Sequence, residues 1–343
     1  MRDRSESFRA FEYAGFSAVA FVAALLCVCV GSVRIRAADA LAVIWNSVWS
    51  LPLPEGVSGP IIMSVRLPRV LCVALSGASL SLCGAAMQGL LRNPLADGST
   101  MGVSAGASLG AVIALAFGVT IPGLPFAGTM AMAMVSAFLS LLLILSLAYR
   151  LDRALSTNTI LLIGVIFSMF AHSVISLISA FAGERVKTIL FWTMGSLAGS
   201  TYVNVIVLLC ALVVCGAAVL PRARELNAFA IGEDNARTVG VNVRRVKLVI
   251  LIAVSALIGV CVSVGGTIGF VGLVMPHITR MLVGPNHRRL LPASMFGGAV
   301  FLMLTDLLAR TIIRPLELPI GVVTSLIGSL VFIYIFAKTR TAR

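Results

Sequence analysis

Charged residues are scarce in this chain of 343 residues. They make up 11% of it, whereas a soluble domain carries about 25%. Hydrophobic residues reach 59%, and the mean hydropathy is +1.06. This composition excludes a soluble globular domain and predicts an all-α polytopic membrane protein, whose helices face lipid and one another.

Lysine is rarer still, with Lys187, Lys247 and Lys338 as the complete set. The motif Gly-x-x-x-x-Gly-Lys-Ser/Thr, whose backbone amides cradle phosphates, occurs nowhere in the sequence. We therefore expect that the chain does not hydrolyse ATP in the usual way and is not an enzyme. If it drives transport, a partner or an ion gradient supplies the energy.

Cysteine pairs at metal-binding or redox spacing are also missing. None of the seven cysteines forms a Cys-x-x-Cys, and all of them fall inside apolar stretches. We expect them to act as small hydrophobic residues in helices rather than as disulfide partners or metal ligands. No metal site and no bound cofactor are predicted.

The formal net charge is +13, which could indicate nucleic-acid binding if the basic residues shared one polar domain. They lie instead between apolar stretches, as the positive-inside rule predicts for a membrane protein. The sequence therefore indicates contact with membrane lipid and not with nucleic acid.

A spanning helix requires about 20 mostly apolar residues, and ten stretches are candidates. They lie near 14–32, 68–90, 101–118, 126–150, 157–181, 202–220, 246–264, 267–283, 291–311 and 318–337. The first follows Arg2, Arg4 and Arg9, as a signal peptide would, but its apolar run is long and no small-x-small site follows. We therefore favour a retained helix. The stretch at 267–283 is short and broken by Pro276, which makes it the weakest candidate.

Ten crossings would put both termini on the same side of the membrane. If the N-terminus is inside, the inner segments hold about two thirds of the 26 Lys and Arg residues. This asymmetry predicts that both termini and residues 221–247 are cytoplasmic. Residues 183–200 are expected to form a short helix at the outer surface.

The segment 221–247 is the one polar island of the chain, with six basic and three acidic residues. It cannot lie in lipid, yet it holds too many apolar residues for a simple linker. Its pattern predicts two short helices, at 226–231 and 234–239, joined at a glycine. Such a pair, protruding from a single transmembrane domain at 1–343, indicates a docking surface.

Glycines at helical spacing, such as Gly102, Gly106 and Gly110, suit close helix packing or a smooth translocation path. The run from Gly102 to Gly106 also matches the Gly-x-Ser-x-Gly motif of hydrolases. That reading requires a strand–turn–helix and a His–acid pair, whereas this run opens an apolar helix. We favour the packing role.

Ionisable residues within the apolar stretches offer few candidates for proton relays. Asp306 lies four residues before Arg310, the spacing of a helical ion pair, which we favour over a relay. His277 follows Pro276, and we expect it to bond a neighbouring helix rather than haem iron or a metal. Arg66 and Arg69 share a helix face and are expected to point to the exterior water. They could be snorkelling anchors or docking points for carboxylates of an external partner.

Several segments taken together resemble one family, the FecCD-type permeases of bacterial ABC importers, which take up vitamin B12, haem and ferric siderophores. The resemblance runs from about residue 60 to the C-terminus. The segments that carry it are 66–69, 84–89, 92–97, 101–107, 226–241, 269–277, 284–288 and 317–322.

The resemblance implies a permease subunit of the bacterial inner membrane that works by alternating access. It would pair with a second copy or a close paralogue, with a homodimer favoured, and each copy would bind one ATPase subunit that holds ATP and Mg. A periplasmic binding protein would deliver the substrate. Ferric siderophore is the first candidate because it is the commonest cargo of the family, with haem and cobalamin as alternatives.

The resemblance also assigns residues to three sites. The loop at 226–241 would couple to the ATPase through Leu226, Asn227, Ala230, Gly232, Glu233, Ala236, Arg237 and Gly240. Cytoplasmic gates would involve Asn93, Leu95, Ser156 and Thr157. The binding protein would dock on Arg66, Arg69 and Arg310.

Two other classes of function stay open from the residues alone. A secondary carrier or channel would run on a proton or sodium gradient without an ATPase, with Asp306 as its site. A structural or receptor role is disfavoured because the chain lacks an extramembrane domain.

Overall fold

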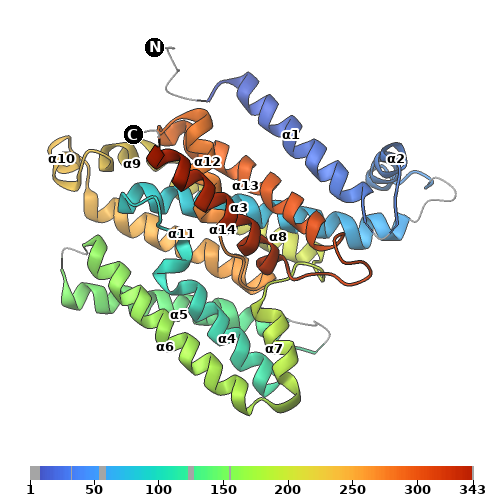
Figure 1. Cartoon of the computed structure of the whole chain (residues 1–343), viewed down its shortest axis with the longest axis horizontal. Coiled ribbons are helices and arrows are strands. Elements are labelled where there is room, and N and C mark those ends of the chain that lie inside the picture. The colour runs from blue at the N-terminus through green and yellow to red at the C-terminus, as the bar shows by residue number, and fades with distance from the viewer. Residues whose placement is uncertain (1–7, 32, 54–58, 123–126, 154–155, 342–343) are drawn as a thin grey trace.

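The computed structural model describes residues 8–31, 33–53, 59–122, 127–153 and 156–341, which form helices joined by loops (Figure 1). Apolar segments in lipid adopt helices because every backbone N–H and C=O must then be satisfied within the segment. The longer helices are α1 (Ala10–Cys29), α2 (Ala37–Val48), α3 (Leu67–Leu91), α4 (Val103–Phe117), α5 (Ala127–Leu151), α6 (Thr157–Phe181), α8 (Tyr202–Val219), α11 (Val243–Gly265), α12 (Val271–Val283), α13 (His287–Ala309) and α14 (Ile320–Thr341). The short ones are η1 (Ile61–Arg66), η2 (Gly98–Met101), η3 (Gly183–Arg185), α7 (Val186–Thr193), η4 (Leu220–Arg222), α9 (Ala223–Phe229) and α10 (Glu233–Thr238).

Each of the ten predicted spans coincides with one helix, namely α1, α3, α4, α5, α6, α8, α11, α12, α13 and α14. Seven stretches of the described chain are long and apolar enough to cross a membrane. The helices α4 and α12 and the described part of α14 are apolar but shorter. The short helix predicted at 183–200 is present as η3 and α7 and ends at Thr193, and its place at the outer surface stays a prediction.

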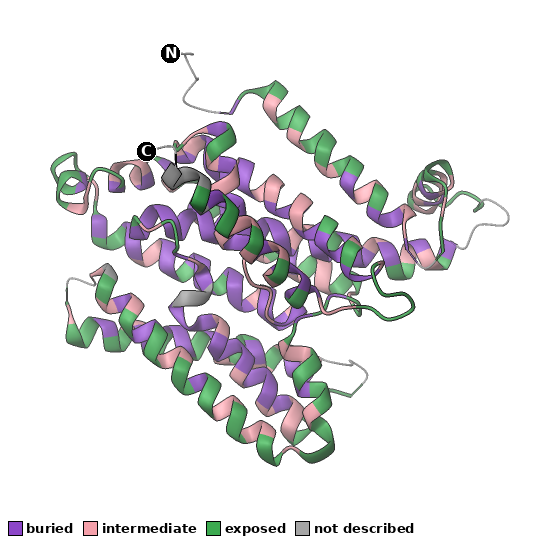
Figure 2. Cartoon of the chain, in the orientation of Figure 1, coloured by how far each residue is buried: buried purple, intermediate pink, exposed green. Residues whose placement is uncertain are grey.

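Helix α3 is the centre of the bundle. In the most apolar 18-residue window of the stretch 61–91, 78% of the residues are buried. In the corresponding windows of the helical stretches that contain α1, α5, α6 and α8, only 17–28% of the residues are buried (Figure 2). Helices α8, α11, α12 and α13 all pack on α3. The exposed apolar faces of α5 and α6 are therefore the faces that lipid or a partner covers.

Glycines let other helices approach α3 closely. A Cβ placed on Gly84 would lie 1.8 Å from the carbonyl oxygen of Gly272 in α12. Likewise, a Cβ on Gly77 would lie 2.3 Å from the carbonyl oxygen of Gly298 in α13. Backbone thus meets backbone at both crossings, which is how small residues drive helix packing in membranes.

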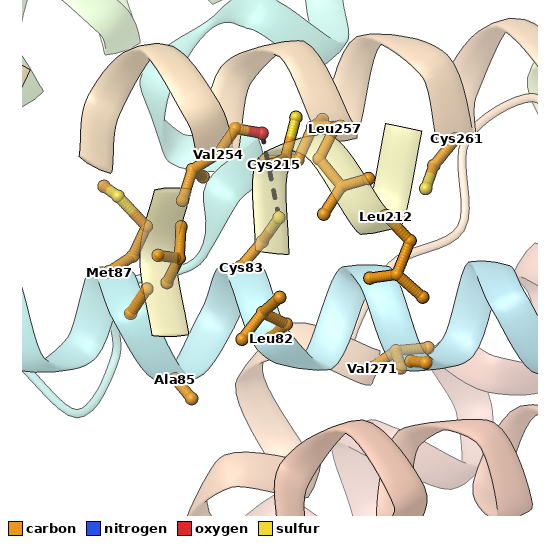
Figure 3. Packing of buried hydrophobic residues seen from close by; sticks show 14 of the residues in the cluster. Leu82, Cys83, Ala85, Met87, Leu212, Cys215, Val254, Leu257, Cys261 and Val271 are labelled. Carbon is orange, nitrogen blue, oxygen red and sulfur yellow. Dashed lines mark hydrogen bonds between the residues drawn. The ribbon is translucent and has the colours of Figure 1, made fainter. Parts of the chain in front are cut away.

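The core around α3 is apolar and includes several of the cysteines (Figure 3). Cys83 of α3 lies 3.7 Å from the carbonyl oxygen of Val254 in α11. Cys215 and Cys261 lie in the same cluster, and all seven cysteines are free. Five of them are buried and fill space as small hydrophobic residues, as the sequence predicts, namely Cys27, Cys72, Cys83, Cys215 and Cys261.

The loops gather at two opposite ends of the bundle (Figure 1). The start of α1, the end of α14 and the pair α9–α10 lie at one end, and α2 and α7 lie at the other. The chain thus enters its first helix and leaves its last helix at the same end, where α9 and α10 also lie. The polar island is therefore separated from the α2–α7 end by the length of the bundle.

Candidate functional site

The polar island folds into two short helices, as the sequence predicts. Helix α9 runs from Ala223 to Phe229 and α10 from Glu233 to Thr238, so α9 begins three residues earlier than expected. Helix α8 continues through η4 into α9 as one helical stretch. The pair is therefore held at a helix end rather than on a free loop.

One face of this pair packs on the bundle. The side chains of Leu226, Phe229 and Ala236 are fully buried. Leu226 and Ala236 were predicted to contribute to coupling, and their burial makes them anchors of the pair. Phe229 is a further anchor within the predicted segment.

The other face is exposed and partly apolar. Ile231 and Val239 keep 61% and 64% of their surface accessible in a segment that is otherwise polar. Ala230, Arg237 and Gly240, which the resemblance assigns to coupling, are exposed on the same pair. Exposed apolar residues rimmed by polar ones mark protein interaction sites. Ile231 and Val239 were not among the predicted coupling residues. The sequence does carry a signal for them, because each is a large apolar residue that stands next to a glycine in a polar segment.

The turn between the two helices depends on glycine and on an ion pair. Gly232 has φ 112° and ψ 151°, a region that only glycine occupies without strain. Glu233 Oε1 lies 2.6 Å from Nζ of Lys247, whose side chain is 2% exposed. Glu233 therefore ties α10 to the N-terminal part of α11 instead of projecting into water.

Asn227 is the polar member of the buried side of α9. Its amide contacts Asn286 and His287 at the start of α13, at 2.8 Å each. The resemblance assigned Asn227 to coupling, and the structure shows that it faces the bundle.

The predicted gate residues lie in two loops at the same end as α9 and α10. Asn93 Oδ1 accepts a hydrogen bond from the backbone of Leu95 at 2.9 Å, and the Leu95 side chain is exposed. Ser156 Oγ lies 2.9 Å from Thr159 Oγ1, and its backbone N–H donates to Asp152. The Thr157 side chain lies outside the described residues.

Helix η2, which follows Leu95, packs against α6, which follows Ser156. A Cβ on Gly102 would lie 2.8 Å from the carbonyl oxygen of Gly164. The two predicted gate loops thus lead into helices in direct contact. Gly102 has a positive φ of 80° and caps α4, so the Gly-x-Ser-x-Gly run is a helix start, and Gly106 packs on Ser140 of α5.

Arg66 and Arg310 are buried, with 5% and 8% of their surface exposed. Arg66 Nη1 donates to the carbonyl oxygens of Val28 at 2.6 Å and Cys29 at 3.3 Å. Arg310 Nη2 donates to the carbonyl oxygen of Cys27. The last carbonyls of a helix lack partners within it, so both arginines cap the end of α1. The expectation that Arg66 points to the exterior water is wrong, because these carbonyls attract its guanidinium inward.

Arg69 is buried as well, in an ion network. Its guanidinium lies 2.9 Å from Asp306 and 2.9 Å from Glu317. Asp306 also pairs with Arg310 at 3.5 Å, which confirms the helical ion pair predicted at this spacing. The expectation that Arg69 faces water is wrong, because two carboxylates of the chain hold it. Docking on the three arginines remains a prediction.

His277 is placed differently from the expectation of a bond to a neighbouring helix. Its Nδ1 is buried and has no hydrogen-bond partner among the described residues. The ring packs edge-on against Phe332 of α14, with 6.2 Å between centroids. The contact between α12 and α14 is therefore aromatic at this point.

A cavity of about 440 Å³ lies between the end of α7, the α11–α12 loop and the start of α14. Its lining combines hydroxyl, glycine and apolar residues and carries no charged side chain. Thr267 donates to the carbonyl oxygen of Thr193, and this bond joins α7 to the loop. The lining residues are Thr193, Met194, Thr267, Gly269, Gly321, Val322, Ser325 and Leu326.

A helical membrane bundle with a core-anchored, partly apolar helix pair at one end agrees with the permease that the sequence motifs predict. The chain matches the FecCD transport family over residues 19–338. It therefore belongs to the FecCD transport family, as the sequence motifs indicate.

Relatives cover most of the chain. The uncharacterised ABC transporter permease protein YvrB of Bacillus subtilis is 43% identical over 94% of this chain and 92% of its own length. The cobalamin import system permease protein BtuC of Halobacterium salinarum is 38% identical, over 84% and 77%. The hemin transport system permease protein HmuU of Yersinia pestis is 35% identical, over 89% and 91%.

A solved structure has the same fold. It is described as an inward-facing conformation of a metal-chelate type ABC transporter, and it superposes with a TM-score of 0.83 at 29% identity. The match covers 95% of this chain and 98% of that one. The arrangement of helices around α3 is thus shared over nearly the whole length.

Proposed function

We propose that the chain is the transmembrane permease subunit of an ATP-binding-cassette importer for a metal chelate. Family membership supports this proposal. The structural observation that carries it is the α9–α10 pair, which presents Ile231 and Val239 to water while Leu226 and Phe229 anchor it in the bundle. Because the chain has no phosphate-binding motif, ATP would be hydrolysed on a separate ATPase subunit. The exposed surface of α9 and α10 is where the movement of that subunit would act on the chain.

The proposed topology has ten crossings in one domain at 1–343, in the bacterial inner membrane. Both termini and the coupling loop at 221–247 are cytoplasmic, by the positive-inside rule. The helices that are too short to cross alone would complete their crossings with the loops that flank them. Non-helical backbone is tolerated at membrane depth where protein or water covers it.

The proposed assembly is a homodimer of permeases with two ATPase subunits and a periplasmic binding protein. ATP and Mg sit on the ATPases, and this chain holds no cofactor. Closure of the ATPases would move α9 and α10, and the bundle would alternate between outward-facing and inward-facing states. Affinity for the substrate would reside in the binding protein, so the path needs no tight site.

The proposed cargo is a ferric siderophore, with haem or cobalamin as alternatives. Relatives are named for cobalamin, hemin and iron(3+)-hydroxamate. The uncharged cavity at the α7 end supports a large chelate over a bare ion, because it offers hydroxyl and apolar contacts without a charged ligand. Binding of each chelate to the cognate external protein, measured by calorimetry, decides among them.

For the binding protein, we propose docking at the α7 end through Arg69 and its neighbours. Glu317, which pairs with Arg69, keeps 46% of its side chain exposed. A carboxylate from outside could therefore compete for the same guanidinium. Arg66 and Arg310 would hold α1 in place beside this contact.

Reconstitution tests the proposed function. The permease, its ATPase and its binding protein are placed in proteoliposomes, and chelate uptake is followed with and without ATP. We expect uptake only when all three proteins and ATP are present. Uptake by the permease alone under a proton or sodium gradient would establish the secondary carrier instead. The pairing of Asp306 with Arg69 and Arg310 disfavours that outcome, because it neutralises the carboxylate such a carrier would use.

A further inference from the structure

Helix α9 is joined to the start of α13 by a cluster of three polar side chains, Asn227, Asn286 and His287. Nδ2 of Asn227 donates to Oδ1 of Asn286 at 2.8 Å. Oδ1 of Asn227 accepts from the backbone N–H of His287 and lies 2.8 Å from its ring Nδ1. We call this cluster the Asn–His clasp.

The backbone fixes every orientation in the clasp. A backbone N–H can only donate, so the bond from His287 identifies the Asn227 atom as oxygen. Oδ1 of Asn286 is identified in the same way, because it accepts from the backbone N–H of Arg288 at 3.0 Å. Since the Asn227 oxygen can only accept, the proton of the His287 ring lies on Nδ1. The clasp therefore has one arrangement of donors and acceptors.

The clasp continues into the central helix. His287 is 5% exposed, and a Cβ on Gly89 of α3 would lie 2.3 Å from its Nε2. That nitrogen is buried and has no hydrogen-bond partner among the described residues. The ring is thus wedged between Asn227 of α9 and the backbone of α3.

The last turn of α3 is itself tied to α12. Gln88 Nε2 donates to the carbonyl oxygen of Leu273 at 3.2 Å, and Gln88 Oε1 accepts from Arg280 at 3.0 Å. A displacement of α9 therefore reaches α13 through hydrogen bonds, α3 through the imidazole, and α12 through Gln88. The contact between α10 and the bundle differs, because it combines the buried Ala236 with the ion pair of Glu233 and Lys247.

We propose that the Asn–His clasp is the joint that transmits the motion of the coupling helices into the membrane bundle, with Asn227 and His287 as its positioning residues. This inference rests on the proposed function as an ABC permease. A rigid, fully specified hydrogen-bonded joint suits this task because it moves as a unit. A purely apolar contact at the same place could slide.

The test compares uptake per ATP in proteoliposomes that contain the full complex. Asn227→Ala removes the centre of the clasp, and Asn286→Ser keeps a serine cap on α13 while it withdraws the acceptor from Asn227. Asn235→Ala is the matched control, because Asn235 bonds only locally, to the carbonyl oxygen of Ile231 at 2.6 Å, in the described structure. We expect Asn227→Ala to lose about tenfold in uptake per ATP hydrolysed by the bound ATPase. Asn286→Ser should lose less than Asn227→Ala, and Asn235→Ala should keep clearly more uptake per ATP than Asn227→Ala.

Unchanged uptake per ATP in both clasp variants would overturn the proposal. Equal losses in Asn235→Ala and Asn227→Ala would overturn it too, because the effect would then belong to the loop as a whole. If Asn227→Ala fails to fold, Asn286→Ser decides alone. Failure of the proposed function is recognised separately, since the wild-type complex would then show no ATP-dependent uptake.

Discussion

At the residue scale, Gly232 and Gly240 bound α10 with different backbone conformations. Gly232 lies in a region open only to glycine, whereas Gly240 has φ 87° and open space around its Cα. The space around Gly232 is also sufficient for a methyl group, whose nearest neighbour would be 3.6 Å away. Strain of the backbone, rather than a clash, therefore decides the effect of a substitution.

We expect Gly232→Ala to distort the turn at a cost of about 1–3 kcal/mol, and thereby to uncouple transport from ATP use while assembly is partly kept. Gly183→Asn is the matched control, because Gly183 has φ 56° with open space around it outside α9 and α10, and asparagine tolerates a left-handed conformation. ATPase binding and uptake per ATP measure both. Normal coupling in Gly232→Ala would contradict the assignment of this turn to the docking surface.

A second residue-scale prediction concerns Glu233 and Lys247. Glu233→Gln removes a carboxylate that lies 2.6 Å from the buried ammonium of Lys247, so it should lower the thermal unfolding temperature of the purified permease. The double change Glu233→Gln with Lys247→Met removes both charges and should recover most of the loss. If the losses of Glu233→Gln and of Lys247→Met, measured separately, add up to the loss of the double variant, the pair does not stabilise α10.

At the element scale, the packing of α3 rests on glycines that no side chain could replace. A Cβ on Gly84 would collide with the backbone of Gly272, whereas a Cβ on Gly216 of α8 would have its nearest neighbours at 4.0 Å. We expect Gly84→Ala to force α3 and α12 apart and to destabilise the fold by at least about 2 kcal/mol. Gly216→Ala should be neutral or stabilising. Thermal unfolding in detergent checks both, and equal unfolding temperatures would refute the close approach.

The capping of α1 separates two roles for Arg310. If its main task is to bind the end of α1, Arg310→Ala should cost about 2 kcal/mol of stability whether or not the binding protein is present. If it serves docking alone, stability should be unchanged and only affinity for the binding protein should fall. Thermal unfolding and binding of the external protein, measured on the same variant, distinguish the two.

The elements themselves were predictable from the sequence, because a lipid-exposed helix needs a long apolar run. The ion pair of Asp306 with Arg310 was also visible, since both lie on one helix at a spacing of four. The partner of Arg69 was not, because Asp306 lies 237 residues away in the chain. The contact of Asn227 with His287, 60 residues apart, was hidden for the same reason: helix packing, not local sequence, brings them together.

At the scale of the whole molecule, the two ends of the bundle should be accessible from opposite sides of the membrane. A cysteine at Asp234, whose side chain is 96% exposed, should react with a membrane-impermeant maleimide in inside-out vesicles. A cysteine at Lys187, in α7, should react in right-side-out vesicles. The exposed Cys210 is first replaced by serine to lower the background. Labelling of both positions from one side would contradict the proposed topology.

The shortness of α12 affects the electrical barrier that a cargo meets. Its 13 residues rise about 20 Å, whereas the hydrocarbon layer is about 30 Å thick. The loop that precedes it, with Thr267, lines the uncharged cavity at the end of α7, and we expect water to enter there. A charged chelate would therefore cross a low-dielectric layer thinner than the bilayer, and the Born energy that opposes its passage falls accordingly.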